Sequence, residues 1–306
     1  MHEPDRSNAD EDRGGDPMTD PSTLSFRFDW AGVLDRQQDR RTGAGSREMR
    51  ASIKEALLPL FVQVGQSDYL RADSLGFWHE GEDRFWLPRF MFQRTRVVKT
   101  RIKVGIFATI HGDEPAGLYG LIDFVRLLDD DPMLGKDYQL WIYPLCNPSG
   151  FVDGTRYARS GTDLNREFWR GSSEPEVRLL EEEIRRREFD GIISLHSDDT
   201  SEGVYGFVGG ATLTEHLLKP ALAAASHAIP TNVDKHIDGF HAIEGVIRSG
   251  YQGILSAPPD THPEPFEIVL ETPALAEMEL QRRAFVHGLA EILGQYRQMI
   301  SYANDI

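Results

Sequence analysis

The chain has 306 residues, enough for one large domain or two small ones with a substantial buried core. Its composition, 40% hydrophobic and 27% charged residues, is typical of a globular protein. The formal net charge of -16 argues against nucleic-acid binding, which needs a basic surface, and against an anionic membrane as partner. The single cysteine, Cys146, excludes an internal disulfide framework.

The N-terminus carries no recognisable targeting signal. Residues 1–22 are rich in Asp, Glu, Gly, Ser and Pro, a composition that predicts a disordered acidic tail. They lack the basic start and apolar core of a secretory signal, and no apolar run approaches the ~20 residues that span a bilayer. We therefore expect a cytoplasmic protein without nucleic-acid or membrane partners. The oligomeric state stays open.

Residues 23–98 predict an N-terminal segment packed on a catalytic domain of residues 99–306. Apolar side chains from Met49 to Phe61 are spaced as on one face of a helix over 47–64. Residues 75–98 predict a β-hairpin with its turn at 80–83. Pro88 in the second run indicates an edge strand, because proline cannot donate to a ladder.

Strands and helices alternate in the rest of the chain. Apolar runs predict strands at 104–110, 138–145, 191–195 and 266–270. Helical spacing predicts helices at about 114–128, 174–189, 214–228 and 274–302. The weakly patterned residues 229–265 are interpreted as loops around one short strand. This order predicts an α/β fold, a three-layer α/β/α sandwich around a mixed, mostly parallel sheet.

Three of the predicted strands end on residues suited to a zinc hydrolase. His111 follows the first of them, His196 the third and Glu271 the fourth. Ligands of open α/β sheets bind beyond the carboxyl ends of the strands, so these side chains should meet at one edge. Glu114 follows His111 by one helical turn, and Gly112 permits a tight turn between them. Two histidines and one glutamate with an open position form a hydrolytic zinc site, so we expect one Zn²⁺ held by His111, Glu114 and His196.

The His-x-x-Glu pattern is weak by itself. It also occurs at residues 79–82 and 241–244, where no buried strand precedes it, and a solvated surface pair explains most such matches. The helical His-Glu-x-x-His motif of other metalloproteases is absent. For His196 alone, a hydrogen-bonded core histidine is the alternative.

A loop rich in arginine lies between residues 147 and 168. It holds Arg156, Arg159 and the neighbours Asn165 and Arg166. A guanidinium donates two parallel hydrogen bonds to a carboxylate, so this loop is a candidate receptor for a substrate carboxylate. Any one of these arginines could instead be a surface charge or a loop clamp. Glu271 follows three apolar residues, and a carboxylate there is costly unless paired or functional, which favours a general base.

The motifs occur in a recognisable order: His-Gly-Asp-Glu at 111–114, Asn-Pro-Ser-Gly-Phe at 147–151, Thr-Arg-Tyr at 155–157, Asp-Leu-Asn-Arg-Glu-Phe at 163–168, Leu-His-Ser at 195–197 and Glu-Thr-Pro at 271–273. The ordered set resembles the zinc carboxypeptidase superfamily, which includes the succinylglutamate desuccinylase and aspartoacylase branch. The resemblance covers roughly residues 100–300.

The resemblance implies a role for each matching residue. The zinc ligands would be the two histidines and Glu114 named above. Asn165 and Arg166 would hold the terminal carboxylate of the substrate, Arg156 would polarise the scissile carbonyl, and Glu271 would be the catalytic carboxylate. Tyr251 is the nearest candidate for a mobile tyrosine that closes on the substrate, although the local sequence does not establish the match.

The expected function is hydrolysis of an amide bond next to a free carboxylate, as a metallocarboxypeptidase or peptide amidase acting on a small peptide. The alternative is a deacylase of N-acyl amino acids. The aspartoacylase branch commonly adds a β-domain after the catalytic glutamate, whereas 35 helical-looking residues follow Glu271, which favours the carboxypeptidase-like branch. A binding module without catalysis is a third possibility.

Asp198 and Asp199 directly follow His196-Ser197. Two carboxylates beside a zinc site would favour a substrate with an amino group near the cleaved bond. The alternative is a solvated acidic loop.

Overall fold

The computed structural model describes residues 44–94 and 102–304. The predicted acidic tail, 1–22, and residues 23–43 lie outside the described residues. Ten strands form one sheet in the order β1-β2-β4-β3-β5-β10-β6-β9-β8-β7. Their bounds are β1 Leu70–Glu80, β2 Asp83–Phe92, β3 Ile102–Ala108, β4 Tyr138–Tyr143, β5 Gly191–Asp198, β6 Tyr205–Val208, β7 His236–Ile237, β8 Phe240–Ile243, β9 Val246–Ile247 and β10 Phe266–Pro273.

The sheet is mixed, and its parallel part lies at the centre. Strands β4, β3, β5 and β10 pair in parallel, whereas β1, β2 and β6 join the sheet antiparallel. The β5 sequence Gly-Ile-Ile-Ser-Leu-His is buried along its length, as expected for a strand covered on both faces. The carboxyl ends of β3, β5 and β10 therefore share one edge of the sheet.

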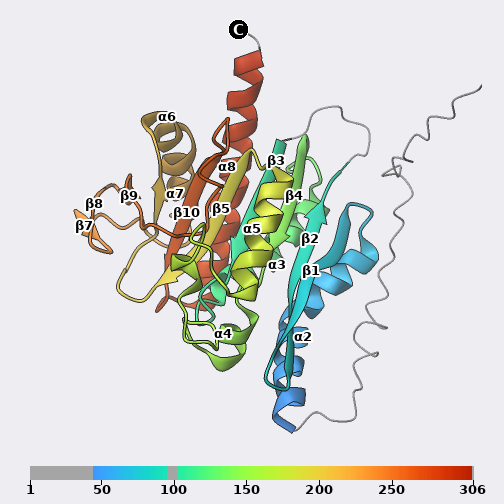
Figure 1. The fold of residues 1–306 in the computed structure, drawn as a ribbon. Coiled ribbons are helices and arrows are strands. Elements are labelled where there is room, and N and C mark those ends of the chain that lie inside the picture. The colour runs from blue at the N-terminus through green and yellow to red at the C-terminus, as the bar shows by residue number, and fades with distance from the viewer. Residues whose placement is uncertain (1–43, 95–101, 305–306) are drawn as a thin grey trace, which may run out of the picture. The chain divides into compact units, whose positions relative to one another are not determined.

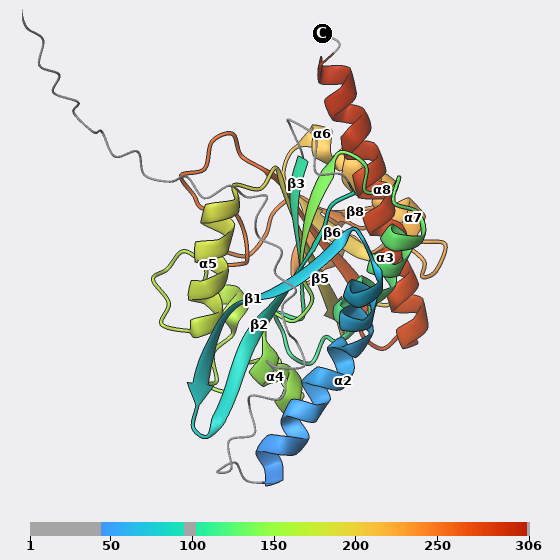
Figure 2. The ribbon, with the colours of Figure 1, turned by 90° about the vertical axis from the view of Figure 1, so that its right-hand side faces the viewer.

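Helices cover both faces of the sheet, which confirms the predicted three-layer α/β/α architecture. In Figure 2, α5 lies on one side of the sheet, and α3, α7 and α8 lie on the other. The main helices are α2 Ala44–Gln66, α3 Ala116–Asp130, α5 Pro175–Arg187, α7 Lys219–Ala225 and α8 Met278–Asn304, with the short α4 Pro148–Asp153 near the carboxyl ends of the strands (Figure 1). The short α6 Ala211–Leu213 and a π-helical turn at Thr214–Leu218 lead directly into α7.

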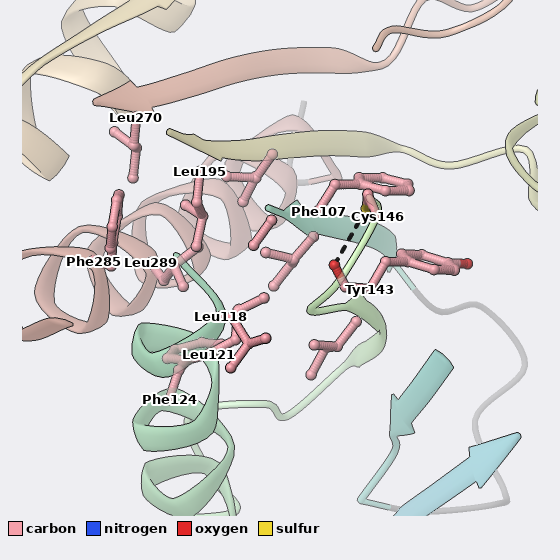
Figure 3. Packing of buried hydrophobic residues seen from close by; sticks show 14 of the residues in the cluster. Phe107, Leu118, Leu121, Phe124, Tyr143, Cys146, Leu195, Leu270, Phe285 and Leu289 are labelled. Atoms are coloured by element: carbon pink, nitrogen blue, oxygen red, sulfur yellow. Dashed lines mark hydrogen bonds between the residues drawn. The ribbon is translucent and has the colours of Figure 1, made fainter. Parts of the chain in front are cut away.

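The main core lies between the sheet and the helices α3 and α8. Figure 3 shows Leu118, Leu121 and Phe124 of α3 facing Phe285 and Leu289 of α8, beneath side chains of β3, β5 and β10. Cys146 is buried in this core, and burial raises the pKa of its thiol to about 12. That thiol is therefore a packing group and not a nucleophile.

The N-terminal hairpin differs from the expectation in two ways. It is hydrogen-bonded into the main sheet through β2 and β4, so it extends the sheet instead of packing on it. Pro88 does not mark an edge strand, because β2 lies between β1 and β4. The proline is tolerated because β4 pairs with β2 only at Phe90–Phe92, so Pro88 lies beyond that ladder.

The stretch 229–265 is more ordered than its sequence suggested. It contains three short strands, β7, β8 and β9, where one was expected, and β6 before it was not predicted. These strands are only two to four residues long, too short for a period of two to show.

Candidate active site

The predicted metal ligands meet at the carboxyl edge of the parallel strands. His111 follows β3 by three residues, His196 lies near the end of β5, and Glu114 precedes α3. Parallel pairing of β10 with β5 sets Glu271 directly beside His196. His111, Glu114 and His196 are all buried.

Their donor atoms converge on one point. His111 Nδ1 lies 2.6 Å from Glu114 Oε1, His196 Nδ1 lies 3.0 Å from Glu114 Oε2, and the two Nδ1 atoms are 3.2 Å apart. Ligands about 2.1 Å from one zinc ion in a tetrahedral arrangement are about 3.4 Å from each other. Among the residues that the structure describes, these three are the only group of His, Cys, Asp or Glu side chains that lie close enough together to hold one metal ion.

The polar contacts of His111 also fit a cation. Its Nδ1 lies near the Glu114 carboxylate, which accepts hydrogen bonds, and 3.2 Å from Arg156 Nη1, which donates them. One ring nitrogen cannot donate and accept at once. A metal ion removes the conflict, because both Nδ1 atoms and the carboxylate then provide lone pairs. Asp163 Oδ1, 3.4 Å from His111 Nε2, would orient the ring from outside.

The electrostatics favour the metal-binding protonation states of Glu114 and His196. Burial alone would raise the pKa of Glu114, but His196 and His111 beside it outweigh burial and hold this pKa well below its usual range. Burial lowers the pKa of His196, which favours its neutral ring. At His111 burial also lowers the pKa, but hydrogen bonds to Asp163 and Glu114 outweigh burial and raise it, so a metal would displace a proton there. An ionised carboxylate and neutral imidazoles are the forms that bind a metal.

A contact between two loops holds the turn that carries two of the ligands. Asn147 Nδ2 donates to the Ile110 oxygen at 3.2 Å, and Asn147 Oδ1 accepts from Gly150 N at 2.8 Å. Gly112 is required here for close approach and not for a positive φ, because a Cβ on it would lie 1.9 Å from the Gly150 carbonyl carbon. Between β3 and Glu114, the residue that has a positive φ is Thr109, at 55°.

Arg156 lies beside the ligand cluster. Its Nε donates to Asp163 Oδ2 at 3.1 Å, and its Nη1 is 3.6 Å from Glu114 Oε1. The guanidinium is partly exposed and lines the same cavity as the ligands. Asp163 therefore holds Arg156 and lies 3.4 Å from His111 Nε2, a position that the Asp-Leu-Asn-Arg motif contained but that was not assigned from sequence.

Asn165 and Arg166 line the cavity on a short 3-10 turn, Leu164–Arg166. Asn165 Oδ1 accepts from Leu255 N at 2.9 Å, so its NH₂ group is the donor that remains for a ligand. The Arg166 guanidinium lies over the Tyr251 ring, 4.1 Å from its centroid. Tyr251 also lines the cavity.

Arg159, expected to bind substrate, has a different position. It is absent from the cavity lining and pairs with Asp153 at 2.7 Å and with Asp83 at 2.7 Å, over the ring of Phe85. Two carboxylates and an aromatic face occupy the guanidinium, so Arg159 ties the loop to the N-terminal hairpin. The interpretation as a substrate ligand is corrected to a loop clamp.

The comparisons with known proteins agree with this geometry. Residues 101–236 match the succinylglutamate desuccinylase/aspartoacylase catalytic domain. The structure is similar to a provisionally named metallopeptidase from Shewanella baltica OS155 (22% identity, TM-score 0.67, 79% of this chain and 91% of that chain). It is also similar to the metallo-carboxypeptidase from Burkholderia cenocepacia (20% identity, TM-score 0.64, 80% of this chain and 69% of that chain). Residues 101–236 therefore resemble that catalytic domain, and the chain shares the fold of these metallopeptidases and carboxypeptidases.

The match to the catalytic domain and the shared fold support a hydrolase of the carboxypeptidase and deacylase type. The carboxypeptidase A from Helicoverpa armigera shares the fold at 15% identity and a TM-score of 0.58, over 87% of this chain and 77% of that chain. None of the curated proteins matches the sequence. No helix in the described part of the chain is long and apolar enough to cross a membrane.

The cavity lined by the three candidate metal ligands has a volume of about 420 Å³, and Glu271, Asp198 and Asp199 also line it. Burial and the neighbouring carboxylates, Glu114 first, raise the pKa of Glu271 well above its usual value. Asp198 is held by hydrogen bonds from Thr200 and Tyr205, whereas Asp199 is exposed. Several lining residues were not predicted as site residues: Asp113, Tyr205, Phe207, Asp238, Ile254 and Val269. Asp113 stood within the His-Gly-Asp-Glu motif, and Val269 two residues before Glu271.

Proposed function

We propose that this chain is a zinc-dependent hydrolase that cleaves an amide bond next to a free carboxylate, as a metallocarboxypeptidase or peptide amidase. One observation carries the proposal. A single cavity combines the His111–Glu114–His196 group and Glu271 with the arginines and the amide that suit a carboxylate, Arg156, Asn165 and Arg166. Its volume of about 420 Å³ suits a short peptide.

The donor set fits zinc, with His111 and His196 binding through Nδ1 and Glu114 through its carboxylate. A zinc ion held there would act as a Lewis acid on the carbonyl and lower the pKa of a water molecule toward ~7. The side chains around it supply the remaining chemistry.

Glu271 is the proton carrier. It lies next to His196 in the parallel register and lines the cavity. Burial and neighbouring carboxylates raise its pKa, which makes it a stronger base for a proton taken from water and later returned to the leaving amine. Arg156, held by Asp163, donates to the carbonyl oxygen as negative charge develops there.

Asn165 and Arg166 recognise the free carboxylate. The Arg166 guanidinium offers two parallel donors, and the Asn165 NH₂ group adds a third. A substrate held at this carboxylate places its adjacent amide bond toward the metal ligands in the same cavity.

The second candidate is an N-acyl amino-acid deacylase with the same machinery. The match of residues 101–236 to the succinylglutamate desuccinylase/aspartoacylase catalytic domain favours it. In both cases the partner is a small substrate, either a short peptide or an N-acyl amino acid.

The test is an assay on three matched substrate sets: dipeptides, the same dipeptides amidated at the C-terminus, and N-acyl amino acids. We expect cleavage that a chelator abolishes and added zinc restores, and loss of cleavage when the carboxylate is amidated. Preference for N-acyl amino acids over dipeptides would select the deacylase. Equal rates on acids and amides, or activity that survives complete metal removal, would refute the proposal.

A further inference from the structure

The β7–β8 hairpin brings to the cavity a carboxylate that no motif marked. Its two-residue tip, Asp238 and Gly239, has positive φ at both positions, 51° and 78°, which is the turn that matches hairpin twist. The hairpin lies at the end of the sheet beyond β6 and β9 (Figure 1). Asp238 nevertheless lines the same cavity as the metal ligands.

Tyr251 lies between this hairpin and Arg166. Its hydroxyl is 3.0 Å from both the backbone oxygen and Oδ1 of Asp238, and it donates to this pair. Phe240, just after the hairpin tip, meets the Tyr251 ring edge to face with centroids 4.8 Å apart. The Arg166 guanidinium lies over the ring 4.1 Å from its centroid. The hairpin, the phenol and the guanidinium therefore form a continuous stack.

We propose that Asp238 is a positioning residue for the carboxylate receptor. By holding the Tyr251 hydroxyl, it keeps the ring against Arg166 and limits the directions that this long side chain can take in the cavity. An arginine side chain that is ordered before the substrate arrives loses less conformational entropy on binding, so the substrate binds more tightly. The inference rests on the proposed function in one respect, that Arg166 receives the substrate carboxylate.

A direct role for Asp238 is the rival explanation, because its charge could attract an amino group on the substrate. Asp238→Asn separates the two roles, since asparagine keeps a side-chain oxygen that accepts from the Tyr251 hydroxyl but carries no charge. Positioning predicts that this variant behaves like the parent. Attraction by charge predicts that it behaves like Asp238→Ala.

The experiment measures Kd for a dipeptide by calorimetry in the Glu271→Gln background, where turnover does not interfere, and KM and kcat in the active protein. Asp238→Ala and Tyr251→Phe should each raise Kd and KM by about five- to tenfold, the effect of one ordinary hydrogen bond, with kcat within about twofold of the parent. The double variant should be no worse than either single one. Asp234→Ala, an exposed carboxylate before the same hairpin and outside the cavity lining, is the matched control and should change nothing.

Additive losses in the double variant, or an Asp238→Asn variant as weak as Asp238→Ala, would overturn the assignment. Unchanged Kd in Asp238→Ala would do the same. Amide hydrogen exchange over residues 246–254 provides a readout that needs no substrate, and it should rise in Asp238→Ala and not in Asp238→Asn. If peptides bind with this dependence but no variant or parent cleaves them, the proposed reaction fails while the role of Asp238 stands.

Discussion

Replacing Gly112 with alanine is expected to remove the metal from a folded protein. A Cβ on Gly112 would lie 1.9 Å from the carbonyl carbon of Gly150 and 2.2 Å from the nitrogen of Phe151. Real Cβ contacts are essentially never below 3.0 Å, so the turn between His111 and Glu114 must move by more than about 1 Å. Zinc sites tolerate errors of about 0.2 Å in ligand distance, so this displacement is several times too large.

The assay is zinc per chain by mass spectrometry after gel filtration, with circular dichroism and thermal unfolding to report the fold. Gly112→Ala should hold well under one zinc per chain while its far-ultraviolet spectrum is retained. Gly294→Ala is the matched control, because a Cβ there meets nothing within 4 Å. His196→Ala removes a ligand without a backbone clash, so it tests the ligand set even if Gly112→Ala fails to fold. One zinc per chain and an unchanged thermal midpoint in Gly112→Ala would refute the reasoning.

Three further predictions concern carboxylates. Glu271→Gln should keep its zinc and lose about 10²–10⁴-fold in kcat, and turnover within a few-fold of the parent would remove Glu271 from the mechanism. Replacing both Asp198 and Asp199 with asparagine should erase any preference for substrates with an amino group near the cleaved bond, with zinc retained, and an unchanged substrate profile would assign both residues to the solvent. Glu176 is fully buried in the first turn of α5, and neither of its carboxyl oxygens has a hydrogen-bond partner among the described residues. Burial with two neighbouring carboxylates raises its pKa to about 8. The unfolded chain releases this proton near pH 4.5 and the folded chain only near pH 8, so stability falls as pH rises between these values. Glu176→Gln should therefore gain up to about 2–5 kcal/mol over the parent at pH 8 and little at pH 4.5 in urea unfolding, whereas the exposed Glu182→Gln should show no such dependence.

The sequence alone was sufficient for the layered architecture and for the three side chains that converge at the sheet edge. Buried parallel strands are continuous apolar runs, so the ends of β3, β5 and β10 could be located by where apolar residues stop. Because the carboxyl ends of parallel strands share one edge of the sheet, His111, His196 and Glu271 could be predicted to lie close together although they are far apart in the chain. Their meeting in the structure follows from local pattern and sheet geometry together.

The local sequence pattern could not assign separate roles to the arginines. Arg156, Arg159 and Arg166 stand in one loop with similar neighbours, and their chemistry is identical. Only the fold shows that Asp83, from the distant hairpin, and Asp153 occupy Arg159, while Arg156 and Arg166 remain at the cavity. A charge's role depends on which opposite charge lies beside it, and that neighbour comes from another part of the chain.

The sequence by itself therefore determined the strands and helices of the parallel centre of the sheet and the three side chains that meet at its edge. The tertiary structure decided what surrounds them. Pro88 is tolerated in an inner strand because the ladder between β2 and β4 begins only two residues later, at Phe90. Asp238 reaches the cavity because a hairpin of two short strands lies beyond β6. Neither position leaves a periodic signal, since each depends on contacts between segments distant in sequence and not on the residues next to it.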